Sequence, residues 1–231
     1  MAARTTQAVL FDLDGTFADT APDLAYALNC MRVSRQLPLL PVATTRAYTS
    51  MGARGLLGVG LDVTPEHPDY AAMRDEFLAH YEANLCRETQ LFPGMAELLD
   101  ELERRGLKWG IVTNKAERYT HPLLKLLGVD HRAACVIGGD TTGKTKPDPA
   151  PLFAATNRMM KRNRELPQLA DRRPSSMSVF GQLQTVKLAS GNDCSSAEAA
   201  VSRSLRYQDR LGVRFPLDEG SLPTYSVEKL R

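Results

Sequence analysis

Cysteine, histidine and tryptophan are scarce in this chain, which has four cysteines, four histidines and one tryptophan in 231 residues. Cys30, Cys86, Cys135 and Cys194 show neither metal-ligand nor disulfide spacing, which predicts a reducing, cytoplasmic location. Neither sign of charge dominates, because the formal net charge is only +2, so nothing indicates a nucleic-acid partner. No stretch approaches the apolar length of a membrane span. What remains is a chain with 43% hydrophobic residues, long enough to bury an α/β core and a smaller second unit.

Two carboxylates follow the first apolar segment. Residues 8–11 (AVLF) predict a buried strand of a parallel sheet, and ligands of such sheets bind beyond the carboxyl ends of the strands. Asp12 and Asp14 lie two positions apart, so an extended backbone directs both side chains to one face, and Gly15 then permits a sharp turn. Carboxylate oxygens suit Mg²⁺, and one carboxylate can attack phosphorus while a second transfers protons. The segment therefore predicts a Mg²⁺-dependent site for a phosphorylated substrate.

Two further predicted strands end near groups suited to phosphate. Residues 108–112 predict a second strand, followed by Thr113 and Asn114, whose hydroxyl and amide can donate hydrogen bonds to phosphate oxygens. Residues 135–137 predict a short third strand, after which a polar loop leads to Lys146. A fixed ammonium there would stabilise the charge that develops on the oxygens of a phosphoryl group during transfer.

These segments resemble the haloacid dehalogenase superfamily of phosphohydrolases, and within it the phosphoglycolate phosphatase-like group. The resemblance covers residues 7 to about 153 and rests on FDLDGT at 11–16, ADTAPD at 18–23, LFPGM at 91–95, IVTNK at 111–115 and GGDTTGKTKPDPAPL at 138–152. It implies a doubly wound α/β core in which Asp12 is the nucleophile and Asp14 the acid and base. It also implies that Thr113, Asn114 and Lys146 bind the phosphate. Asp12 and the backbone carbonyl of Asp14 would then hold Mg²⁺.

The segment between the first two motifs predicts a helical cap. Apolar side chains recur at helical spacing over 24–31 and 70–85, and the resemblance implies a cap that closes over the site and selects the substrate. Within it, the glycine-rich stretch 51–58 predicts a turn. Its Arg54 could bind a substrate carboxylate through two parallel hydrogen bonds, although a solvated surface arginine is the alternative. We therefore expect a core formed by 1–17 and 91–153 and a cap formed by 18–90.

The C-terminal third departs from this pattern. The family's fourth motif, an apolar strand followed by Gly-Asp and a second acid that completes the Mg²⁺ site, is not found beyond Lys146. Glu165, Asp171 and Asp193 are the acids between 165 and 195, and none follows an aliphatic run. Serine is also redistributed, with two residues in 1–153 and ten in 154–231. We predict a divergent tail over 154–231, from a shifted reading frame or a gene fusion, with one candidate strand in 178–188 and a sheet that lacks a strand.

Three functions remain open at this point. The first is a phosphatase acting on a small phosphorylated metabolite, with phosphoglycolate favoured over sugar phosphates such as N-acetylmuramate 6-phosphate. The second is a pseudo-phosphatase that binds a phosphorylated ligand without turnover, because the fourth motif is missing. The third is a nucleotide-binding P-loop, since residues 138–145 fit G-x-x-x-x-G-K-[ST]. Pro147, Pro149 and Pro151 disfavour the helix that a P-loop requires there.

Overall fold

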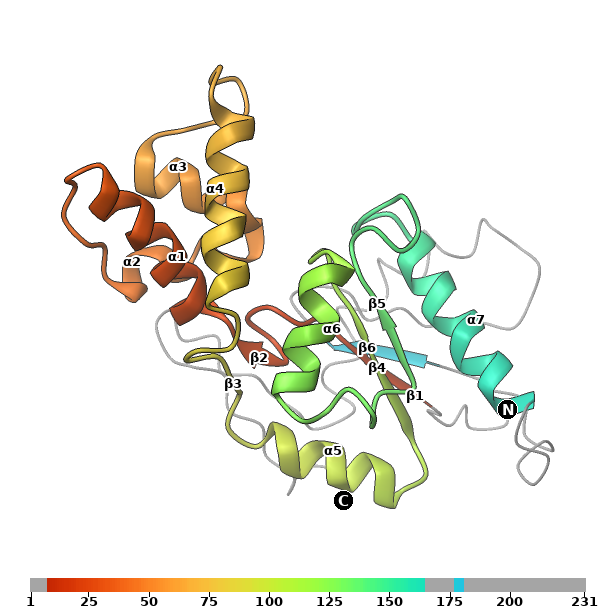
Figure 1. Ribbon diagram of the computed structural model, residues 1–231. Helices are drawn as coiled ribbons and strands as arrows, with labels where there is room; N and C mark the ends of the chain where they lie inside the picture. Colours follow the sequence, from red (N-terminus) through yellow and green to blue (C-terminus); the bar gives the residue numbers. More distant parts are fainter. Residues whose placement is uncertain (1–7, 165–176, 181–231) are drawn as a thin grey trace.

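A parallel sheet forms the centre of the molecule, with a helical lobe beside it (Figure 1). The computed structural model describes residues 8–164 and 177–180. The strand order is β5-β4-β1-β6, where the strands are β5 (Cys135–Ile137), β4 (Lys108–Val112), β1 (Ala8–Phe11) and β6 (Met177–Phe180). The bounds of β1, β4 and β5 agree with the predicted strands, because each is a short, almost wholly buried apolar run.

The register of the sheet brings the predicted motifs to one edge. Phe11 lies opposite Ile111 of β4, and Val112 lies opposite Ile137 of β5. Because all the pairs are parallel, the segments that follow β1, β4 and β5 leave the sheet at the same edge.

Strand β6 corrects one expectation. It pairs in parallel with β1 over four positions, ending with Phe180 opposite Phe11, so the prediction that the sheet lacks a strand at this place was wrong. The strand begins one residue before the candidate segment 178–188. The acids considered for the fourth motif, Glu165, Asp171 and Asp193, lie outside the described residues, as does most of the predicted tail.

Helices cover both faces of the sheet. Alternate residues of β1 point to opposite sides, so Val9 and Phe11 pack with helices α5 (Met95–Arg104) and α6 (Glu117–Leu126), which bury Leu99 and Leu123. The other face, which includes Leu10, packs against Ala155 and Met159 of α7 (Ala150–Arg164). Helix α7 therefore crosses residue 154, the predicted start of the tail, and part of it belongs to the core.

The helical lobe lies between β1 and α5 in the chain. It contains α1 (Ala21–Ser34), α2 (Val42–Arg46), the 3-10 turn η1 (Thr49–Met51), α3 (Gly52–Leu61) and α4 (Tyr70–Ala83). An antiparallel pair, β2 (Ala18–Asp19) and β3 (Gln90–Leu91), joins the two connections between lobe and core. Buried Leu28, Leu56 and Phe77 form the centre of the lobe. We retain 18–90 as the proposed extent of the cap.

The predicted glycine-rich turn is instead part of a helix. Residues 52–61 form α3, and two of its glycines lie where the backbone must approach its neighbours closely. A Cβ at Gly60 would lie within 2.8 Å of three atoms of the Leu28 side chain, and one at Gly55 would lie 3.0 Å from the Tyr48 carbonyl oxygen. These glycines permit close packing inside the lobe. The prediction of a turn from the glycines of 51–58 was therefore wrong.

Asp23 fixes the base of the cap. Its buried carboxylate accepts hydrogen bonds from the backbone N–H groups of Glu88 (2.8 Å) and Thr89 (3.1 Å) and from the Thr89 hydroxyl (2.6 Å). One side chain in α1 thereby holds the segment that leads from the helical lobe back to the core. No helix in the described part of the chain is long and apolar enough to cross a membrane.

Candidate active site

Asp12 lies at the end of β1 and contacts Lys146. The Lys146 Nζ is 2.8 Å from the Asp12 Oδ1 and also donates to the Val112 carbonyl oxygen at 2.8 Å. The Leu13 N–H donates to the same Asp12 oxygen at 2.8 Å. The predicted nucleophile and the predicted charge clamp are therefore together, although 134 positions separate them in the sequence.

Asn114, predicted to bind phosphate, also contacts the backbone of Lys146. Its amide donates to the Lys146 carbonyl oxygen (3.1 Å), and its Oδ1 accepts from the Lys146 N–H (2.8 Å). Both ends of the amide are thus engaged in holding the loop that presents Lys146. The buried Thr113 hydroxyl accepts from the Lys115 N–H at 3.2 Å, which leaves its own O–H proton to be donated to a phosphate oxygen.

Asp14 forms a second ion pair, with a lysine that the motif analysis did not select. The Lys115 Nζ lies 2.9 and 3.2 Å from the two oxygens of the Asp14 carboxylate, and the Thr20 hydroxyl donates to Oδ1 at 2.7 Å. A signal was present in the sequence, because Lys115 follows Thr113 and Asn114 directly in the loop after β4. Sequence spacing could not reveal which acid it would meet.

A tyrosine of cap helix α4 lies over this second pair. The Lys115 Nζ is 4.6 Å from the centre of the Tyr81 ring, on its face, and Tyr81 in turn packs edge-on against Tyr119 of α6 at 5.8 Å. Burial raises the pKa of Tyr81 to about 12. Burial lowers the pKa of Lys115, but the Asp14 carboxylate and Tyr81 raise it, and the net pKa lies above its ordinary value. Lys115 is therefore a buried, charged ammonium.

Two arginines of the cap differ in their surroundings. Arg46 in α2 binds Asp19 of β2 through two parallel hydrogen bonds, at 2.6 and 3.0 Å. Arg54, predicted to bind substrate, is exposed on α3, and among the described residues it has no ion pair. Its charge lowers the pKa of Glu66, after the larger effects of hydrogen bonds from Thr64 and the Glu66 backbone.

Two motif-like segments have structural roles. Asp140, which follows Gly139 in a pattern similar to the fourth motif, accepts a hydrogen bond from the Glu117 N–H at 2.8 Å and so caps α6. Within the described segment 138–164, the first helix after the P-loop-like pattern begins only at Ala150, and Lys144 pairs with Asp148 at 3.1 Å. The helix that a P-loop requires is therefore not formed there, which argues against the nucleotide-binding interpretation.

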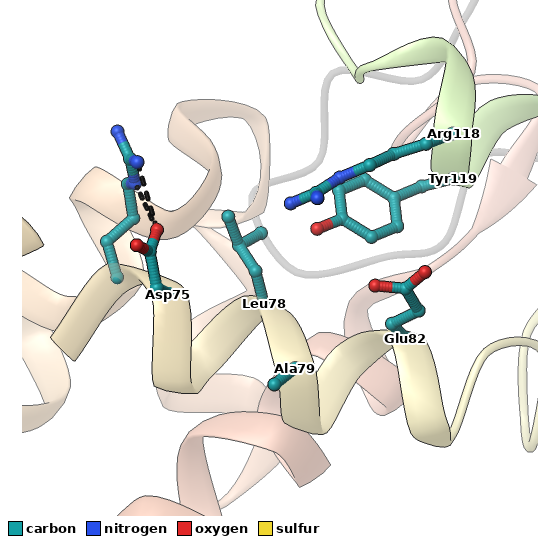
Figure 2. Close-up of a pocket in the computed structure, with 7 residues that line it drawn as sticks. Asp75, Leu78, Ala79, Glu82, Arg118 and Tyr119 are labelled. Atoms are coloured by element: carbon teal, nitrogen blue, oxygen red, sulfur yellow. Dashed lines mark hydrogen bonds and ion pairs between the residues drawn. The ribbon is translucent and has the colours of Figure 1, made fainter. Parts of the chain in front are cut away.

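A cavity lies between the cap and the core. Its volume is about 330 Å³, and its lining residues come from α4 and α6 (Figure 2). Both signs of charge occur around it, since the lining includes Arg118, Asp75 and Glu82. The guanidinium of Arg118 extends along the ring of Tyr119, 4.5 Å from its centre. The cavity contains none of the predicted site residues and is distinct from the two acid–lysine pairs.

Few of the described side chains at this edge of the sheet could bind a metal ion. Within the described ranges, no group of three or more histidine, cysteine, aspartate or glutamate residues could hold a metal ion. The family resemblance assigns Mg²⁺ to the Asp12 carboxylate and the Asp14 backbone carbonyl, which directly follow β1. This set fits Mg²⁺, which commonly binds one or two carboxylates and takes its other ligands from water and substrate phosphate.

The chain is thus an α/β protein with a parallel core, a helical lobe inserted after the first strand and two acid–lysine pairs at the sheet edge. The chain belongs to the haloacid dehalogenase-like hydrolases, whose family model matches residues 9–167. The resemblance inferred from the motifs is thereby confirmed.

Named relatives within this family are phosphatases. A phosphoglycolate phosphatase of Xanthomonas campestris is 44% identical over 159 residues, which are 68% of this chain and 70% of that protein. An N-acetylmuramic acid 6-phosphate phosphatase of Pseudomonas putida is 41% identical over 149 residues, 64% of this chain and 67% of the relative. This chain is accordingly a phosphatase of the haloacid dehalogenase-like family.

Solved structures share the fold. The crystal structure of a predicted phosphoglycolate phosphatase from Haemophilus somnus aligns with a TM-score of 0.59 and 27% identity, covering 67% of this chain and 72% of that one. CbbY of Rhodobacter sphaeroides, solved in complex with phosphate, aligns with a TM-score of 0.54 and 19% identity, covering 76% of this chain and 77% of its own. At that identity the second comparison concerns the fold alone.

Proposed function

We propose that this phosphatase hydrolyses a small phosphate monoester through an aspartyl-phosphate on Asp12, with Mg²⁺ as its cofactor. The observation that supports this most strongly is the contact between Lys146 and Asp12 at the end of a central strand. A carboxylate and an ammonium so placed can attack a phosphoryl group and neutralise the charge on its oxygens.

In the first step, an Asp12 oxygen attacks phosphorus, and the bond between phosphorus and the ester oxygen breaks. Protonated Asp14 gives its proton to the departing oxygen, so the product leaves as an alcohol. The Thr113 hydroxyl and the Lys146 ammonium would hold phosphate oxygens during this transfer. Asn114 acts indirectly, because its side-chain amide binds both the N–H and the carbonyl oxygen of the Lys146 backbone.

In the second step, Asp14, now a carboxylate, takes a proton from water as the water oxygen attacks the phosphorus. The bond to Asp12 breaks, and inorganic phosphate is released, with Asp12 restored as a carboxylate and Asp14 as the protonated acid. Asp12 and the Asp14 carbonyl would hold Mg²⁺, which when bound supplies positive charge beside the phosphate and the attacking carboxylate.

Phosphoglycolate is the favoured substrate, and N-acetylmuramate 6-phosphate is the nearest rival. The names of the two relatives described above support both. Phosphoglycolate carries a carboxylate opposite its phosphate, and the exposed Arg54 guanidinium is the proposed cap residue for that group.

Hydrolysis assays test this function. The full chain should hydrolyse p-nitrophenyl phosphate and phosphoglycolate only when Mg²⁺ is present, and Asp12→Asn, purified in parallel, should have no activity. Turnover that survives in Asp12→Asn would contradict the mechanism, because it would come from another residue or from a contaminating phosphatase.

A binding protein without turnover is the second candidate. It is favoured by the missing fourth motif, since none of the acids between 165 and 195 follows an aliphatic run. A folded, monodisperse sample that binds phosphoglycolate in calorimetry without hydrolysing it would support this candidate over the enzyme.

A further inference from the structure

Lys115 has no direct role in the proposed reaction, yet it is the more buried of the two lysines at the site. Its side chain is 7% exposed, against 22% for that of Lys146. Its ammonium lies within hydrogen-bond distance of both oxygens of Asp14. Removing an ammonium from water is costly, so a buried ammonium needs an oppositely charged partner. Its presence at the site despite this cost indicates a function.

The contacts of Lys115 fix the direction in which Asp14 points. Lys115 approaches both carboxylate oxygens from the loop after β4, and Thr20 donates to one of them from the beginning of the cap. A carboxyl group with these two donors on different chain segments has little freedom to rotate. Proton transfer requires such fixed geometry, because the acid must lie within hydrogen-bond reach of the departing oxygen.

One aromatic side chain of the cap, Tyr81, also contacts this ion pair. Tyr81 of α4 is 1% exposed, and its face covers the Lys115 ammonium. The electrons of the ring face attract the cation, and the ring excludes water from the ion pair. Tyr81 also belongs to the buried cluster of the cap, together with Phe77 and Leu28. A displacement of α4 would therefore remove the cover from Lys115.

We propose that Lys115 is a positioning residue for Asp14 and that Tyr81 of the cap holds this pair in place. The inference rests on the proposed function, in which Asp14 is the acid and base. It deepens that function by linking the geometry of the acid and base to the position of the cap.

The test exploits the different demands of the two steps. A p-nitrophenolate group departs without receiving a proton, whereas an alkyl oxygen needs one, and the second step needs a base with either substrate. In Lys115→Met, phosphorylation by p-nitrophenyl phosphate should persist while dephosphorylation slows. We expect a rapid burst of one p-nitrophenolate per enzyme and a kcat reduced about 10- to 100-fold, with a parallel fall in KM and little change in kcat/KM, because only the second step is slowed. Hydrolysis of phosphoglycolate should show no burst.

Matched variants separate positioning from general damage. Lys125→Met removes an exposed ammonium from the neighbouring helix α6 and should behave as the wild type. Tyr81→Phe keeps the covering ring and should retain activity, whereas Tyr81→Leu should reproduce part of the Lys115→Met defect. Phe77→Leu removes another buried ring from α4 and should affect stability without producing a burst.

The outcomes distinguish this inference from the proposed function. If the wild type shows no Mg²⁺-dependent hydrolysis, the proposed function fails. If the wild type is active and Lys115→Met matches it in kcat, or if Tyr81→Leu and Phe77→Leu behave alike, the positioning inference is overturned. A urea-unfolding cycle of Lys115→Met, Asp14→Asn and the double variant needs no activity. Non-additive effects are expected, and additive effects would also overturn the inference.

Discussion

The two acid–lysine pairs at the site differ in exposure and in what surrounds them. Asp12 and Lys146 have side chains that are 26% and 22% exposed, and both belong to the core. Asp14 and Lys115 are 17% and 7% exposed, and a cap residue, Tyr81, covers them. The first pair is thus open to an incoming phosphate, and the second is enclosed between core and cap.

This difference matches the demands of the two proposed roles. A nucleophile must be reached by the substrate, so its pair has to remain partly open. An acid and base must be held at a fixed angle and kept from bulk water, which a buried ammonium and a ring achieve together. In the mechanism that we propose, the cap contributes to catalysis through the contact of Tyr81 with Lys115.

Removing the nucleophile of the open pair should have the largest effect. Asp12→Asn leaves the side-chain volume nearly unchanged but abolishes attack on phosphorus, so kcat should fall at least about a thousandfold. Steady-state assays with p-nitrophenyl phosphate measure this. Comparable activity in the variant and the wild type would exclude Asp12 as the nucleophile.

Removing the ammonium of the same pair should be the next most severe change. In Lys146→Met, Asp12 remains but the charge on the phosphoryl oxygens is no longer neutralised, and kcat/KM should fall about 100- to 1000-fold. No burst is expected, since the first step itself is slowed. A burst like that of Lys115→Met would mean that the two lysines act alike and would remove the distinction between the pairs.

The base of the cap offers a way to disturb the enclosed pair from a distance. Asp23→Ala leaves the N–H groups of Glu88 and Thr89 without their acceptor, which should lower the free energy of unfolding by about 1–3 kcal/mol. Because the cap positions Tyr81, the burst expected for Lys115→Met should also appear in Asp23→Ala, in weaker form. Urea unfolding and stopped-flow assays measure both effects. Unchanged stability would contradict the role given to Asp23.

A variant that touches neither pair should have the smallest effect. Arg54→Ala removes an exposed guanidinium of α3, and it should raise KM for phosphoglycolate about 5- to 10-fold while leaving KM for p-nitrophenyl phosphate unchanged. p-Nitrophenyl phosphate is the control, since its leaving group carries no carboxylate. Equal changes for both substrates would assign Arg54 a structural role.

Local patterns predicted three of the four strands of the described sheet but missed helix α3 of the cap. The apolar runs at 8–11, 108–112 and 135–137 predicted three strands because buried strands leave a short, continuous apolar signal. The helix at 52–61 was missed because two of its glycines serve close packing, Gly60 against Leu28, which is 32 residues earlier in the chain, and Gly55 against the Tyr48 carbonyl. Glycine spacing does not reveal what the backbone approaches.

The site shows the same limit. The sequence motifs selected Asp12, Asp14 and Lys146, and the register of the sheet explains why they meet at one edge. The Lys115 partner of Asp14 and the Asn114 contacts with Lys146 depend on loop geometry, which one sequence does not specify. Tyr81 belongs to the apolar pattern over 70–85 that predicts a helix, and its position over Lys115 follows only from the placement of the cap.

Trapping the covalent intermediate tests the central claim most directly. Asp14→Asn should be phosphorylated by p-nitrophenyl phosphate but should hydrolyse the intermediate slowly, because it lacks the base. Borohydride reduction followed by peptide mass spectrometry should then find homoserine at position 12, the product expected from an aspartyl-phosphate. Turnover by the wild type without any modified Asp12 in this variant, or a phosphoryl group on another residue, would contradict the account.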